Sequence, residues 1–139
     1  MKLLFVCTGN TCRSPMAQAM AADLFAAAEV CSAGLMAMPG SPASAHAVAA
    51  MEARQLALRQ HQAQIVTKDL LEAADLVLAM TPGHKVALMR NFPGLGHIHT
   101  LGEYAGCGTV VDDPFGGDFD VYQRCAEGIF ALLRKIKLD

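Results

Sequence analysis

Short apolar runs alternate with longer stretches of helical periodicity along the chain. The apolar runs suit buried strands, and they end at residues such as Thr, Gly, Asn and Pro, which favour turns. This pattern predicts strands over residues 2–6, 30–32, 75–80 and 98–101. The intervening stretches, several of them rich in Ala, Met or Leu, predict helices over 14–28, 42–54, a short stretch after 67, a segment from 82 onwards, and 121–137.

Strands that alternate with helices at this spacing are typical of an α/β domain with a mostly parallel sheet and helices on both faces. No linker, internal repeat or low-complexity tract divides residues 1–139, so we expect a single domain. Such sheets bind their ligands at the carboxyl ends of the strands. The loop that follows the first strand is therefore the first place to look for chemistry.

Composition and charge narrow the function classes. Hydrophobic residues make up 53% of the 139 residues and charged residues 17%, which excludes disordered and fibrous proteins. The net charge of −2 argues against a nucleic acid or an anionic membrane as partner. The five cysteines are odd in number and scattered, and no apolar segment reaches signal-peptide or membrane-spanning length. We therefore expect free thiols and a cytoplasmic location.

The first loop combines a nucleophile with groups that bind anions, and it reads Cys7-Thr8-Gly9-Asn10-Thr11-Cys12-Arg13-Ser14. Ser14 followed by Pro15 predicts a helix start, with Ser14 as the N-cap and Pro15 in the first position. A loop wrapped ahead of a helix N-terminus aims several backbone N–H groups at one point, where an anion can bind. Asn10 is a residue type that tolerates a left-handed backbone in such a loop.

The positive end of this helix and Arg13 both favour a thiolate at Cys7. Arg13 can also hold two oxygens of a phosphate through its planar guanidinium. An ionised nucleophile beside a phosphate site favours phosphoryl transfer to sulfur. The plain alternative is a core cysteine at the end of a strand and a surface arginine. An ATP-binding loop is excluded, because no Gly-Lys-Ser/Thr follows the glycine.

Residues 6–17, from Val6 to Ala17, resemble the signature of the low-molecular-weight protein tyrosine phosphatases. Later landmarks follow in that family's order, so the resemblance covers essentially the whole chain: Ser32-Ala33-Gly34, His61 with Val66-Thr67, residues 74–80, and Asp113-Pro114-Phe115-Gly116. The resemblance implies a four-stranded parallel sheet, phosphorylated proteins as substrates, and a cysteinyl-phosphate intermediate. It implies no metal and no other cofactor.

The resemblance also implies roles for particular residues. Cys7 would attack phosphorus, Arg13 and the loop amides would hold the phosphate oxygens, and Asp113 would act as general acid and then as base. Ser14 would donate a hydrogen bond to the thiolate. Substrate-binding positions would further include Thr8, Gly9, Asn10, Thr11, Cys12 and Phe115, while Ser32 and His61 would brace Asn10. An ordinary loop histidine remains the alternative for His61, and simple packing beneath the loop remains the alternative for Cys12.

Residues 112–120 allow interpretations other than a loop that carries the general acid. A calcium loop is disfavoured because the acidic residues lack the required spacing. A plain turn followed by a helix capped by Asp118 or Asp120 is the better alternative. The five histidines do not form a pattern typical of metal ligands.

Two departures from the tyrosine-specific pattern bear on the substrate. Position 11 is Thr rather than a bulkier aliphatic residue, and Phe115-Gly116-Gly117 stands where tyrosine-specific eukaryotic members carry an aromatic pair. Both departures resemble the bacterial protein-arginine phosphatases of the family. We therefore expect phosphoarginine as substrate, with phosphotyrosine as the alternative.

Two rival functions share the fold or the motif. Arsenate reductases of this fold need shuttling cysteines near the third strand and its following helix, and residues 75–96 contain none. A phosphopeptide-binding module without activity would be expected to lose Cys7 or Asp113, and both are present. We expect a monomeric enzyme.

Overall fold

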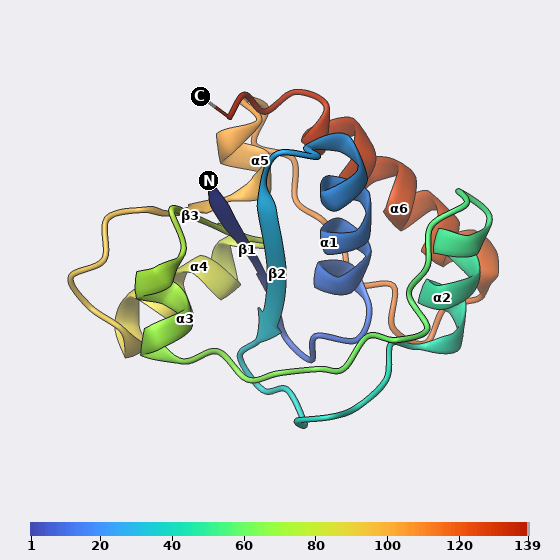
Figure 1. Cartoon of the computed structure of the whole chain (residues 1–139), viewed down its shortest axis with the longest axis horizontal. Helices are drawn as coiled ribbons and strands as arrows, with labels where there is room; N and C mark the ends of the chain where they lie inside the picture. Colours follow the sequence, from blue (N-terminus) through green and yellow to red (C-terminus); the bar gives the residue numbers. More distant parts are fainter. Residues whose placement is uncertain (139) are drawn as a thin grey trace.

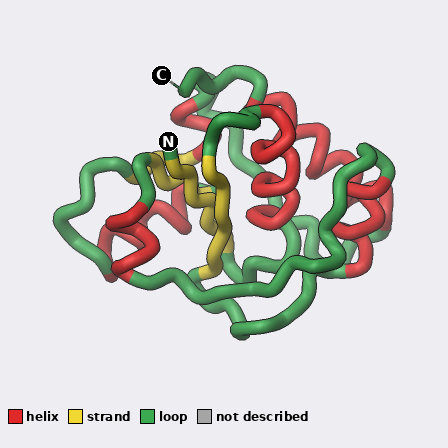
Figure 2. The backbone as a smooth tube through the Cα atoms, in the orientation of Figure 1, coloured by secondary structure: helices red, strands yellow, loops and turns green. Residues whose placement is uncertain are grey.

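Four parallel strands form the centre of the molecule. The computed structural model describes residues 1–138 and orders the strands β2-β1-β3-β4 (Figure 1). Their bounds are β1 Lys2–Cys7, β2 Glu29–Gly34, β3 Leu76–Ala79 and β4 Ile98–Thr100. The predicted four-stranded parallel sheet is thus confirmed. Figure 2 shows the loops that follow β1 and β2 gathered at the carboxyl end of the sheet.

Helices cover both faces of this sheet (Figure 1). They are α1 Arg13–Leu24, α2 Ala45–Glu52, α3 Lys68–Ala73, α4 Pro82–Asn91, α5 Leu101–Tyr104 and α6 Phe119–Leu133. α1, α2 and α6 lie on one side of the strands, and α3 and α4 lie on the other. No helix in residues 1–138 is long and apolar enough to span a bilayer.

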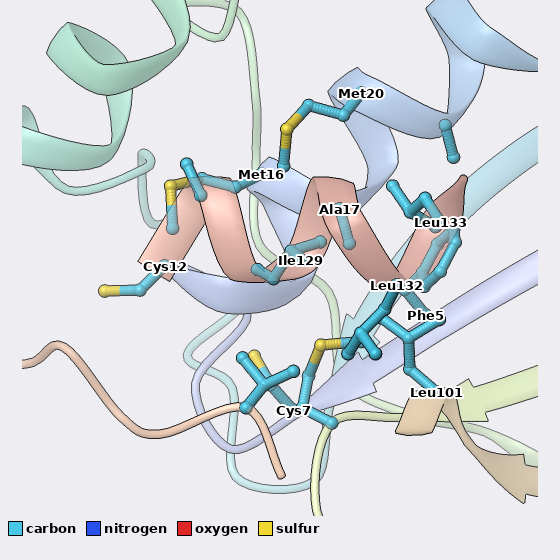
Figure 3. Close-up of a cluster of buried hydrophobic side chains, with 14 of the residues drawn as sticks. Phe5, Cys7, Cys12, Met16, Ala17, Met20, Leu101, Ile129, Leu132 and Leu133 are labelled. Atoms are coloured by element: carbon cyan, nitrogen blue, oxygen red, sulfur yellow. The ribbon is translucent and has the colours of Figure 1, made fainter. Parts of the chain in front are cut away.

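The alternation of side chains along β1 divides the core between the two faces. Leu3 and Phe5 belong to the cluster formed with α1 and α6, whereas Leu4 and Val6 belong to the cluster formed with α3 and α4. Because both faces are buried, β1 is apolar at nearly every position, as is typical of a central parallel strand. Figure 3 shows Phe5 together with side chains of α1 and α6 that belong to the first cluster: Met16, Ala17, Ile129, Leu132 and Leu133. Cys7 lies at the end of β1, in the same cluster.

The start of α1 differs from the prediction. Ser14 is not the N-cap: the helix begins at Arg13, and Cys12 occupies the N-cap position without a side-chain capping bond. The hydroxyl of Ser14 instead contacts Cys7 Sγ and Asn10 Nδ2. The Ser14 side chain therefore contacts the loop that follows β1 instead of capping α1. Pro15 falls in the first turn of α1 rather than at the first helical position.

Other boundaries shift by local capping. Helix α2 begins at Ala45 rather than at Pro42, because the Ser44 side chain accepts from Ala47 N. Helix α6 begins at Phe119 behind the capping Asp118 and ends at Leu133, four residues short of the prediction. Helix α1 ends at Leu24 rather than near residue 28. The short α5 was not predicted, and a capping box between Thr100 and Glu103 forms its first turn.

Candidate active site

The loop from Cys7 to Arg13 directs three of its carbonyl groups towards neighbouring segments. Amides of these segments donate to them: Leu35 N to Cys7 O (3.0 Å), Met36 N to Thr8 O (2.8 Å) and Ser44 N to Thr11 O (2.9 Å). In a trans peptide, the N–H of the next residue points opposite to the carbonyl. The N–H groups that follow these carbonyls therefore face the inside of the loop. Such an arrangement of N–H groups is typical of an anion-binding nest.

The side chain of Ser14 connects this nest to Cys7. Ser14 Oγ lies 2.8 Å from Cys7 Sγ and 2.9 Å from Asn10 Nδ2. Because the Asn10 amide group donates to Ser14, the single hydroxyl hydrogen of Ser14 is free for the sulfur. The network thus favours a hydrogen bond donated to Cys7 Sγ, which stabilises a thiolate.

Asn10 is the central brace of the loop. Its backbone is left-handed, with φ of 57°, which confirms the conformation expected for this residue. Asn10 Nδ2 donates to Ser32 Oγ (2.9 Å), and His61 Nε2 lies 2.7 Å from Asn10 O. Both contacts follow the predicted bracing. Gln64 and Gln18, which the sequence analysis missed, also belong to this hydrogen-bond network. Gln64 N donates to Asn10 Oδ1, and Ser32 Oγ donates to Gln18 Oε1.

Gly34, at the end of β2, leaves space for the backbone of the loop that follows β1. A Cβ atom at this position would lie 2.6 Å from Thr8 O and 2.9 Å from Asn10 N, both of which are backbone atoms. Any other residue would therefore push the loop away from the sheet. The predicted strand end at Ala33-Gly34 consequently has a steric reason that the sequence pattern alone does not state.

Arg13 links the nest to the acid loop. Its guanidinium is almost fully buried; Nη1 donates to Val111 O (3.1 Å), and Nη2 lies 3.7 Å from Asp113 Oδ2. The Asp113 side chain is 55% exposed, and its Oδ1 accepts from Phe115 N (3.0 Å). The arginine is thus fixed by the protein, while the carboxylate stays accessible from solvent.

A cavity of about 270 Å³ opens above the nest. It brings together eight of the residues predicted from the sequence: Cys7, Thr8, Gly9, Thr11, Cys12, Arg13, Asp113 and Phe115. The Phe115 side chain is 82% exposed. The other four predicted residues, Asn10, Ser14, Ser32 and His61, form the bracing network described above.

Cys12 makes contacts of its own beneath the loop. Its Sγ lies 3.3 Å from Tyr122 Oη and donates to Ser44 Oγ (3.5 Å). Burial, together with the contact to Cys12, raises the pKa of Tyr122 to about 12, so its hydroxyl stays protonated. Packing beneath the loop is therefore a real role of Cys12, in addition to its place at the cavity.

His84 is a site residue that sequence reasoning missed. It lies in the first turn of α4, and its Nε2 is 2.9 Å from Thr8 Oγ1. Burial and the neighbouring Arg13 lower the pKa of His84 to about 4, against a smaller opposing effect of Asp113. The sequence held one signal: the predicted helix start at Thr81-Pro82 follows a strand, so its first turn lies at the ligand-binding end of the sheet.

The site has the groups needed for covalent phosphoryl transfer. It has a hydrogen-bonded cysteine, a nest of N–H groups, a buried guanidinium and an exposed carboxylate around one cavity. Within residues 1–138, no group of three or more His, Cys, Asp or Glu side chains is placed to hold a metal ion.

This fold and this site define a cysteine-dependent phosphatase. The family model for low molecular weight phosphotyrosine protein phosphatase matches residues 2–137. The chain belongs to that family, and its substrates are phosphorylated proteins.

Similar proteins fall into two groups by name. A protein-arginine-phosphatase of Bacillus subtilis is 42% identical, over 98% of this chain and 94% of its own length. The low molecular weight protein-tyrosine-phosphatase PtpB of Staphylococcus epidermidis is 39% identical, over 99% of this chain and 97% of its own length. Among solved structures, a serine variant of the arginine phosphatase YwlE with a phosphorylated active-site serine aligns with a TM-score of 0.92 at 42% identity, covering 97% of this chain and 92% of that chain.

Proposed function

We propose that this phosphatase hydrolyses phosphoarginine in proteins through a cysteinyl-phosphate intermediate. In the first step, Cys7 Sγ attacks phosphorus, the P–N bond breaks, and Asp113 gives its proton to the departing guanidine nitrogen. In the second step, Asp113 takes a proton from a water molecule, whose oxygen attacks phosphorus while the S–P bond breaks. Inorganic phosphate leaves and the thiolate returns.

The geometry supports these roles. Arg13 and the N–H groups of the loop surround the position that the phosphate oxygens would take, and Ser14 stabilises sulfur both as nucleophile and as leaving group. Asn10, Ser32 and His61 hold the loop in place. Without such bracing, the N–H groups of the loop would no longer point at one position. Asp113 is exposed at the same cavity, where a leaving group must pass.

The choice of phosphoarginine rests on Thr11. Its side chain lines the cavity together with Cys7 and Asp113, and its Oγ1 lies 3.7 Å from Cys12 Sγ. A threonine is compact and carries a hydroxyl, so it suits a planar, polar guanidinium better than an apolar phenyl ring. The arginine phosphatase of Bacillus subtilis is among the similar proteins, which supports the same choice.

Phosphotyrosine is the second candidate, because Phe115 keeps one aromatic ring at the cavity although Phe115-Gly116-Gly117 lacks an aromatic pair. The exposed Phe115 ring at the cavity offers an apolar wall against which a phenol ring could stack. The similarity to the tyrosine phosphatase PtpB points the same way.

Thr11→Ile separates the two candidates. Isoleucine adds apolar bulk and removes the hydroxyl, which leaves a guanidinium N–H unpaired at about 1–3 kcal/mol, or roughly ten- to a hundredfold in specificity. We expect kcat/KM to fall on phosphoarginine peptides and to hold or rise on phosphotyrosine peptides. Thr11→Val serves as the matched control, because it removes the hydroxyl at nearly constant volume. A ratio of the two kcat/KM values that stays constant, or a wild-type preference for phosphotyrosine, would overturn the proposal.

We also propose that the enzyme acts as a monomer in the cytoplasm. The five cysteines are free thiols, which suits a reducing compartment. Sedimentation equilibrium of the reduced protein checks the oligomeric state, and a mass of twice 14.7 kDa would contradict a monomer.

A further inference from the structure

A histidine and a threonine from distant parts of the chain meet at the rim of the cavity. His84 Nε2 lies 2.9 Å from Thr8 Oγ1, and Thr8 lines the same cavity as Thr11. His84 is only 8% exposed, whereas Thr8 is an exposed residue. The imidazole is therefore held inside the protein, and the threonine that it contacts borders the cavity.

The second ring nitrogen of His84 is unusual. Nδ1 is the one buried side-chain nitrogen or oxygen in residues 1–138 without a hydrogen-bond partner. A buried polar atom without a partner destabilises the folded state, so a position that retains one calls for an explanation. Packing does not supply it, because an apolar side chain would fill the space without that penalty.

His84 lies in the first turn of α4, and its contact with Thr8 can form in either tautomer of the neutral ring. Nε2 either donates a proton to Thr8 Oγ1 or accepts the hydroxyl proton of Thr8. The Thr8 hydroxyl is fixed by this bond and keeps a further lone pair for a donor from the substrate.

The charge of the pair suits a cationic leaving group. With a pKa lowered to about 4, His84 is neutral at ordinary pH, because burial and Arg13 oppose its protonation. A neutral imidazole holds the hydroxyl without repelling a guanidinium. A lysine or a protonated histidine in the same place would repel it.

We propose that Thr8 and His84 form a specificity-determining pair, in which Thr8 Oγ1 accepts a hydrogen bond from a guanidinium N–H of the substrate and His84 acts as the positioning residue. The inference deepens the proposed function and rests on it. Thr8 thus adds a second polar contact at the mouth, besides the contact assigned to Thr11. Phosphotyrosine has no N–H at this place and would gain nothing from the pair.

The test compares two substrates in four proteins. kcat/KM is measured on a phosphoarginine peptide and on para-nitrophenyl phosphate, which lacks a nitrogen donor, for the wild type and for Thr8→Val, His84→Leu and His84→Gln. We expect the ratio of phosphoarginine to aryl phosphate activity to fall roughly tenfold or more in Thr8→Val and in His84→Leu. We expect His84→Gln to restore most of the ratio, because its side-chain amide can reach the place of Nε2 and can donate or accept the hydrogen bond.

The double variant Thr8→Val/His84→Leu shows whether His84 acts through Thr8. We expect its ratio to equal that of Thr8→Val alone, since the second substitution then removes nothing more. His97→Leu is the matched control: His97, which comes just before β4 and does not line the cavity, has its Nε2 2.7 Å from Leu71 O. We expect its ratio to stay at the wild-type value.

The outcomes separate this inference from the proposed function. A wild type that prefers phosphotyrosine overturns phosphoarginine as the proposed substrate. The change in the ratio of phosphoarginine to aryl phosphate activity between wild type and variants still shows whether Thr8 and His84 contribute to specificity. An unchanged ratio in Thr8→Val overturns the inference and leaves the phosphatase assignment intact. Equal loss on both substrates, without recovery in His84→Gln, would make His84 a structural residue and would overturn the inference as well.

Discussion

The guanidinium of Arg13 lies 3.7 Å from the carboxylate of Asp113, although the two residues come from opposite ends of the chain. The arginine therefore faces the phosphate site and contacts the acid loop at the same time. Arg13 also donates to Val111 O, two residues before Asp113 in the same loop. These contacts hold the acid loop beside the nest. Arg13 therefore supports both the loop of the proposed nucleophile and the loop of the proposed general acid.

Asp113→Asn should reveal the general acid through its dependence on the leaving group. An amide cannot donate a proton as an acid does, so we expect turnover of substrates with poor leaving groups to fall by about 10²–10⁴-fold. Aryl phosphates with acidic phenols need little protonation, and their loss should be smaller. Asp112→Asn, at the neighbouring exposed carboxylate, is the control. Equal losses on all leaving groups would show that Asp113 is not the acid.

Cys7→Ser should abolish turnover and preserve phosphate binding. The serine hydroxyl does not ionise near neutral pH, while the nest and Arg13 remain in place. Steady-state kinetics measures the first effect, and calorimetric titration with inorganic phosphate measures the second. Cys31→Ser is a control, because Cys31 lies in β2 with its Sγ donating to Leu3 O. Activity above a few percent in Cys7→Ser would exclude a covalent intermediate on this sulfur.

Peroxide treatment should link Cys7 to Cys12. We expect oxidation of the Cys7 thiolate to a sulfenic acid, which the Cys12 thiol attacks with loss of water to form a disulfide. To react, Cys12 must leave its contacts with Tyr122 and Ser44. Mass spectrometry checks the product, and thiol reductant should restore activity. In Cys12→Ala we expect sulfinic acid at Cys7 instead. Sulfinic acid at Cys7 in the wild type, with Cys12 untouched, would refute protection by Cys12.

The free energy of unfolding should depend on pH through His84. The folded protein lowers the pKa of His84 to about 4, whereas an unfolded histidine titrates near its ordinary value of 6.5. Between these values the unfolded chain binds more protons, so stability falls as pH is lowered from about 6.5 to about 4. Arg13 opposes the proton at His84, and Asp113 favours it more weakly.

Urea denaturation of the wild type and His84→Gln over this pH range measures the contribution. We expect a shallower loss of stability in the variant, because glutamine has no proton to take up. Carboxylates titrate in both proteins and cancel in the comparison. Parallel curves for the two proteins would mean that His84 is not held neutral in the folded state.

Local chemistry in the sequence was enough to predict most of the architecture and to single out the loop that lines the cavity. The apolar runs and their turn residues predicted all four strands, because a buried parallel strand needs apolar side chains on both faces. Six of the seven residues from Cys7 to Arg13 line the cavity, so their common loop was visible in one stretch of sequence. Asp113 came from the resemblance to a family, since an acidic residue before a proline has no unique meaning by itself.

Ser14 shows where the local pattern misleads. A serine before a proline favours an N-cap, yet its hydroxyl contacts Cys7 and Asn10, because the chain wraps so that all three side chains meet. The choice between two hydrogen-bond partners depends on the path of the loop. That path is set in turn by contacts from β2 and from the segment around Gln64.

The tertiary structure alone decided the pairing of Thr8 with His84. The two residues are 76 positions apart, and they meet because β1 and β3 are neighbours in the sheet, so the loop after β1 lies beside the first turn of α4. Sequence periodicity shows which residues are buried and which lie in loops. It does not state strand order, and it therefore cannot say which loops share an edge of the sheet. Hydrogen bonds between distant segments, such as Thr8–His84 and Ser32–Gln18, form only after the sheet has brought those edges together.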